Sequence, residues 1–63
     1  MSDLESYILV VTWRGGEQAK FTTQARDLAE ARRLAREWAE RERPWPVVAV
    51  RDISPTWREI ARR

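Results

Sequence analysis

Two adjacent glycines, Gly15-Gly16, separate residues 7–13 from residues 17–25, and each of these segments reads as a β-strand. Glycine adopts positive φ without a steric penalty, and a two-residue hairpin loop requires positive φ at both central positions. A loop of this length also fixes the register of the two strands. The glycine pair therefore predicts an antiparallel hairpin in which Val10 faces Phe21 and Arg14 faces Glu17.

This register gives the hairpin two different faces. The first face carries apolar side chains from both strands: Ile8, Val10, Ala19, Phe21 and Ala25. The second face is apolar on the first strand and polar on the second, with Tyr7, Leu9, Val11 and Trp13 opposite Gln24, Thr22, Lys20 and Gln18. We expect a helix to cover the first face. The function then depends on whether the second face is covered or is left free to bind a partner.

A long helix is predicted to follow the hairpin. Asp27 and Glu30 have the spacing of a capping box, and Pro44 ends the helix near Arg43. At 100° per residue one stripe of this helix is apolar, comprising Leu28, Ala31, Leu34, Ala35, Trp38 and Ala39. The small alanines favour a close approach to the sheet, and we expect Trp38 and Phe21 to be buried between helix and sheet.

The last third of the chain predicts a strand and a short helix. Residues 47–53 follow the stiff connector Pro44-Trp45-Pro46 and read as a third strand. Ser54-Pro55 is a favourable helix start, so residues 55–63 are expected to form a short C-terminal helix. Trp45 is open to two interpretations, a lid on the core edge or an exposed contact.

Connection rules then give the topology. A right-handed crossover through the helix brings the third strand to the free edge of the first. The predicted fold is a single α+β domain over residues 1–63, with ββαβ order and a three-stranded antiparallel sheet in the order 2-1-3. Residues 1–6 are expected to form a flexible N-terminus.

Composition restricts the chemistry. The 63 residues include no cysteine and no histidine, so zinc sites and histidine-assisted nucleophiles have no ligands or bases. Most carboxylates alternate with arginines on the predicted helix, as on a solvated helical face. We therefore expect a non-enzymatic protein with no catalytic, cofactor-binding or metal-binding residues. No segment is long enough to cross a membrane, and the expected location is the cytoplasm.

The second hairpin face and the C-terminal helix form the predicted partner-binding surface. With four tryptophans and a net charge of +2, the chain has more aromatic and arginine residues than the core needs. These residue types contribute most of the binding energy at protein interfaces. The candidate site residues are Tyr7, Trp13, Lys20, Trp57, Arg58, Arg62 and Arg63. The alternative is a purely structural role, in which Trp57 packs on Trp13 as a second small core.

Four segments resemble small hairpin–helix–strand proteins of phages and mobile elements. They are the strand 7–13, the Arg14-Gly15-Gly16 turn, the Lys20-Phe21-Thr22-Thr23 segment and the helix 30–39. Some of these are anti-CRISPR inhibitors. The resemblance is one of pattern and size over residues 7–53, and it implies a protein partner, such as a bacterial defence complex. The alternative is a small nucleic-acid-binding module using the open sheet face and the C-terminal arginines. Unpaired sheet edges also predict a homodimer or strand addition to a partner.

Overall fold

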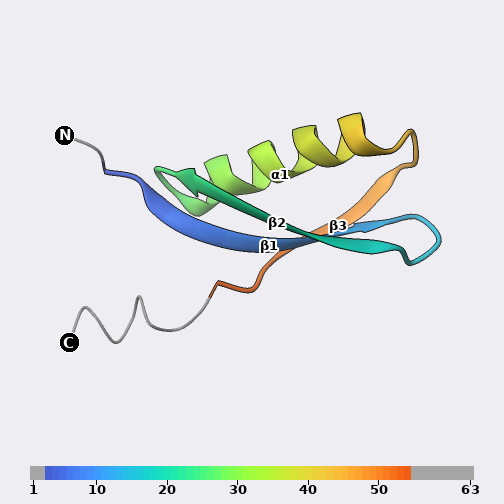
Figure 1. Ribbon diagram of the computed structural model, residues 1–63, viewed down its shortest axis with the longest axis horizontal. Helices are drawn as coiled ribbons and strands as arrows, with labels where there is room; N and C mark the ends of the chain where they lie inside the picture. Colours follow the sequence, from blue (N-terminus) through green and yellow to red (C-terminus); the bar gives the residue numbers. More distant parts are fainter. Residues whose placement is uncertain (1–2, 55–63) are drawn as a thin grey trace.

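A computed structural model describes residues 3–54 of the chain. The elements are β1 (Glu5–Trp13), β2 (Gln18–Ala25), α1 (Leu28–Glu42) and β3 (Val47–Asp52). The three strands form one antiparallel sheet in the order β2-β1-β3, and α1 lies along one face of it (Figure 1). The predicted α+β fold with ββαβ order is confirmed. The predicted C-terminal helix over residues 55–63 lies outside the described residues.

The hairpin loop is one residue longer than predicted. The N–H of Gly16 donates to the Trp13 carbonyl at 3.0 Å, and the N–H of Trp13 donates to the Glu17 carbonyl at 2.9 Å. Gly15 and Gly16 both have positive φ, at 101° and 91°, as expected. Arg14 joins them in a three-residue loop, so Trp13 faces Glu17.

The longer loop shifts the register of β2 by one residue. Leu9 faces Phe21 and Val11 faces Ala19, whereas the prediction opposed Val10 to Phe21. Side chains alternate between the two faces of a strand, so a one-residue shift moves every β2 side chain relative to β1. The apolar side chains of β2 therefore share a face with the odd-numbered residues of β1.

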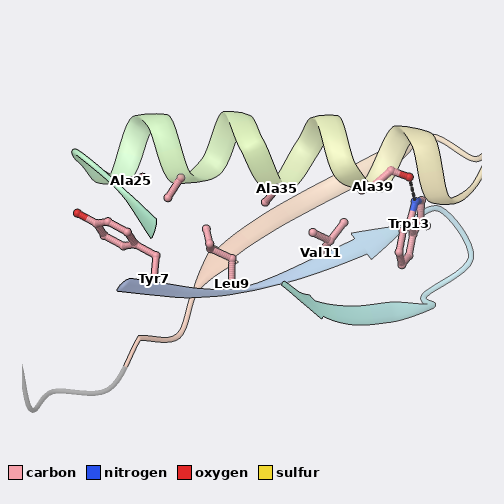
Figure 2. Packing of buried hydrophobic residues seen from close by; sticks show 8 residues of the cluster. Tyr7, Leu9, Val11, Trp13, Ala25, Ala35 and Ala39 are labelled. Atoms are coloured by element: carbon pink, nitrogen blue, oxygen red, sulfur yellow. Dashed lines mark hydrogen bonds between the residues drawn. The ribbon is translucent and has the colours of Figure 1, made fainter. Parts of the chain in front are cut away.

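The helix covers this odd-numbered face. Tyr7, Leu9, Val11 and Trp13 point from β1 toward α1 and are buried (Figure 2). The prediction that α1 covers the face bearing Ile8 and Val10 is wrong, because it depended on the two-residue loop. The apolar side chains of β2 now share the covered face with the odd-numbered residues of β1, and the mismatch between the strands moves to the face where Ile8 and Val10 lie opposite Thr22 and Lys20.

The alanine stripe of α1 forms the other half of the core. Ala31, Ala35 and Ala39 are fully buried against the sheet. Small side chains let the helix lie close, and the larger Trp38 sits beside the stripe. Trp38 is half-buried and packs on Phe21 with ring centroids 5.1 Å apart. Both rings lie between helix and sheet at the β2 side, although neither is fully buried.

Other element bounds differ slightly from the prediction. β1 begins at Glu5 rather than Tyr7, because Glu5 pairs with Ala25 at the end of β2. The expected flexible N-terminus over residues 1–6 is therefore too long. The helix has Asp27 and Arg43 as its caps, close to the predicted ends.

The N-terminus of α1 is closed by a reciprocal pair of hydrogen bonds. Asp27 Oδ1 accepts from the backbone N–H of Glu30 at 2.8 Å, and Glu30 Oε1 accepts from the backbone N–H of Arg26 at 2.8 Å. The predicted capping box is present, with Glu30 reaching one residue beyond the cap. The bond from the Arg26 backbone, and secondarily the nearby Arg26 guanidinium, lower the pKa of the Glu30 carboxyl.

The cap predicts an acid-sensitive contribution to stability. A carboxyl whose pKa is lower in the folded state stabilises the fold above its unfolded pKa, about 4.3 for glutamate. This contribution is lost as the pH falls through the lower folded-state value. Glu30→Gln should therefore lose less thermal stability than the wild type between pH 7 and pH 3, measured by circular dichroism. Glu40→Gln, on an exposed part of α1, is the control and should follow the wild type. A Glu30→Gln profile identical to the wild type would contradict this assignment.

Candidate functional site: the open sheet face

The even-numbered face of the sheet carries no covering element among residues 3–54 (Figure 1). We call this surface the open face, and it contains Ser6, Ile8, Val10, Thr12, Gln18, Lys20, Thr22, Gln24, Ala49, Arg51 and Ile53. Ile53 lies just past β3 and donates its N–H to the Ile8 carbonyl at 2.8 Å. The alternation of β3 places it on the same face as Arg51.

The centre of the open face is an apolar side chain between two cations. Val10 is the cross-strand partner of Lys20 on one side and of Arg51 on the other. Lys20 and Arg51 are exposed, whereas Val10 is half-buried. In the next row Ile8 lies beside Ile53, which is 38% exposed. The open face therefore combines an apolar centre with flanking positive charge.

No carboxylate belongs to the open face within the described strands. The acidic residues of β1 and β3, Glu5 and Asp52, alternate onto the helix-covered face. Lys20 and Arg51 form no ion pair within the described part of the chain. Such a surface is complementary to a partner that presents acidic groups around an apolar patch.

The structure relocates two of the predicted site residues. Tyr7 and Trp13 are 6% and 1% exposed, so their predicted placement on an uncovered sheet face is wrong. The cause is again the loop length, which turns their side of the sheet toward α1. Lys20 is exposed on the open face, as predicted. Trp57, Arg58, Arg62 and Arg63 lie outside the described residues.

The sequence prediction also missed four residues of the open face. Ile8, Val10 and Arg51 replace Tyr7 and Trp13 at its centre, and Ile53 extends it. The available signal was the apolar–polar mismatch of the predicted second face. A one-residue slip moves that mismatch to the other face, where the half-buried Ile8 and Val10 lie opposite Thr22 and Lys20.

A second surface feature lies at the hairpin end of the molecule. Arg43 sits over the rings of Trp13 and Trp45, with its Cζ 5.2 and 5.0 Å from the two ring centroids. It also forms an ion pair with Glu17 at 2.9 Å. Trp45 is 44% exposed, so it both covers Arg43 and remains on the surface. Arg43 thereby joins the end of α1 to the hairpin.

A shallow groove on the β3 side of α1 is lined by arginines. Its lining consists of Arg32, Arg33 and Arg36 together with Val50 of β3. Arg33 pairs with Glu37 at 2.8 Å. No ion pair involves Arg32 or Arg36 among the residues that the structure covers. The groove adds positive charge on the helix side, away from the open face.

Between residues 3 and 54 there is no group of three or more acidic, histidine or cysteine side chains placed to hold a metal ion. No helix in that range has the length and apolar character needed to cross a membrane.

Comparisons with protein-family models, curated protein sequences and solved structures gave no match to this chain.

Proposed function

We propose that this chain is a non-catalytic protein-binding module that docks through its open face. The observation that carries the proposal is the row Lys20–Val10–Arg51, in which an apolar side chain lies between two cations. Interfaces combine an apolar centre with a polar or charged rim, and positive rims select acidic partners. The partner is therefore a protein surface with acidic groups around an apolar patch.

Nucleic acid is the competing partner, because phosphates also bind lysine and arginine. Modules that read single strands on a sheet stack bases on exposed aromatic rings. The described open face contains no aromatic side chain, and Tyr7 and Trp13 are buried on the other side. These features favour a protein partner over stacked bases.

The resemblance to phage-type inhibitors suggests which proteins to test first. An anti-CRISPR inhibitor acts by docking on a bacterial defence complex, which needs a binding surface and no catalytic groups. An acidic surface of such a complex would have the charge that the open face requires. This role would place the protein in the cytoplasm of a bacterial host.

The test is a capture experiment with paired charge reversals. The wild type should retain a discrete protein from nuclease-treated bacterial lysate. Lys20→Glu combined with Arg51→Glu should weaken binding of that protein at least about tenfold, because like charges would face its acidic groups. The matched control is Arg36→Glu combined with Arg41→Glu, which makes the same charge change on exposed α1 positions. Both variants should keep the wild-type melting temperature.

Two outcomes would overturn the proposal. Capture that disappears with nuclease and falls steeply with salt would assign the open face to nucleic acid. Equal binding by the open-face variant and the wild type would remove the open face from the interface. A measurement of bacterial defence activity with the same two variants tests the inhibitor role separately.

A further inference from the structure

β2 is an edge strand with little protection against pairing. It runs from Gln18 to Ala25, and its register with β1 continues without a bulge along this length. It contains no proline, and Lys20 is its one charged residue. Natural edge strands are normally kept apart by short length, bulges, prolines or charges. β2 therefore presents a regular edge on which another strand fits.

β3 forms the opposite edge and carries the protection that β2 lacks. It has only six residues, and its register with β1 shifts at Thr12/Trp13. Pro46 precedes it, and the Asp52 carboxylate accepts the N–H of Ser54 at its far end. The two edges of the same sheet are thus unequal, and strand pairing is favoured at β2.

The direction of the β2 backbone groups follows from the hairpin. The N–H of Trp13 donates to the Glu17 carbonyl, so odd-numbered β2 residues bond to β1 and even-numbered residues face outward. The outward groups belong to Gln18, Lys20, Thr22 and Gln24. All four have polar side chains, and these side chains lie on the open face.

We propose that a second copy of this chain pairs with β2, antiparallel and across a two-fold axis at Phe21. In this register Gln18 faces the second copy's Gln24, and Lys20 faces its Thr22. No like charges stand directly opposite each other, whereas an axis at Lys20 would oppose two lysines. The edge is therefore complementary to itself, as a two-fold interface requires. The two sheets become one continuous sheet with both helices on the same side.

The helix side of the proposed interface also gains burial. Phe21 lies at the axis, and its ring already packs on Trp38 at 5.1 Å. Phe21, Trp38 and Leu34 are half-buried on the β2 side of the core. A second copy brings the two Phe21 rings together as a cross-strand pair, an arrangement that stabilises antiparallel sheets. This inference is independent of the partner proposed for the open face.

Amide hydrogen exchange on the wild-type protein provides the direct test. The N–H groups of Lys20, Thr22 and Gln24 should exchange about tenfold more slowly at millimolar than at low-micromolar concentration, the factor given by ~1.4 kcal/mol of protection. The N–H of Val50 faces the β3 edge, and its exchange should not change. Unchanged exchange at β2, or equal slowing at both edges, would overturn the proposal.

Sedimentation of two variants supplies the second test. Thr22→Pro removes an outward N–H without removing a bond to β1, so the variant should stay folded and sediment as a monomer. Thr22→Val keeps the N–H and should dimerise like the wild type. A monomeric wild type at millimolar concentration would refute the dimer, as would a folded Thr22→Pro that still dimerises. If Thr22→Pro unfolds, the amide hydrogen exchange of the wild type decides whether the β2 edge pairs with a second copy.

Discussion

Trp13→Ala is expected to lower the free energy of unfolding by about 3–5 kcal/mol, the range found for truncating buried tryptophan or phenylalanine. The Trp13 side chain is 1% exposed, and its Nε1 donates to the Ala39 carbonyl at 3.3 Å (Figure 2). Its ring also contacts Trp38, at 6.2 Å between centroids. Domains of this size have a total stability of roughly 3–9 kcal/mol. Much of the variant should therefore be unfolded at 25 °C, as measured by circular dichroism and urea titration.

The matched control for Trp13 is Trp45→Ala. Trp45 is 44% exposed and contacts the Arg43 guanidinium, so its truncation should cost about 1 kcal/mol or less. The two variants remove the same side chain from neighbouring positions around Arg43. Wild-type stability in Trp13→Ala would mean that α1 covers the other face of the sheet.

Val11→Asp is the second large effect expected. Val11 is fully buried beneath α1, and an unpaired carboxylate there should cost about 4 kcal/mol or more. We expect the variant to be unfolded in buffer at neutral pH. The measurement is far-UV circular dichroism together with the dispersion of the amide proton spectrum.

The adjacent residue supplies the matched control. Val10→Asp makes the same change on the open face, between Lys20 and Arg51, where opposite charges offset part of the lost strand propensity. Its cost should be about 1 kcal/mol or less, and the variant should fold. A folded Val11→Asp together with an unfolded Val10→Asp would reverse the two faces.

Local sequence signals were sufficient to predict the elements and their order. Asp27 and Glu30 marked the start of α1, Pro44 marked its end, and the alanine stripe identified its buried side. The glycine pair located the hairpin, and both residues have the positive φ that was expected. These features depend on neighbours in the sequence, so they could be read without knowledge of the tertiary packing.

The choice of covered face depended on one residue of loop length. Gly15-Gly16 fits a two-residue loop and also fits the last two positions of a three-residue loop. The loop alone does not separate these options, but burial does. With Leu9 facing Phe21, the apolar side chains of β2 join the four large ones of β1, whereas the shorter loop would join them only to Ile8 and Val10. Weighing the larger apolar area of Tyr7, Leu9, Val11 and Trp13 against that of Ile8 and Val10 would have placed the covered face correctly.

The candidate site inherited the same error. Tyr7 and Trp13 were chosen because aromatic side chains dominate interfaces, yet large apolar side chains also fill cores. Lys20 was correctly placed on the sheet face away from α1, because its side chain points to the other side of β2 from the apolar side chains of that strand. Arg51 could not be assigned to the open face without the register of β3, which the bulge near Trp13 shifts.

The clustering of three tryptophans determines which part of the molecule their fluorescence reports on. Trp13 contacts Trp38, and Arg43 lies over both Trp13 and Trp45, so three indoles gather at the hairpin end of the molecule. Within residues 3–54 the opposite end contains no tryptophan. Fluorescence from these three indoles therefore reports on one end of the domain, whereas circular dichroism averages over all of it. Coincident melting curves from the two signals would mean that both ends open together.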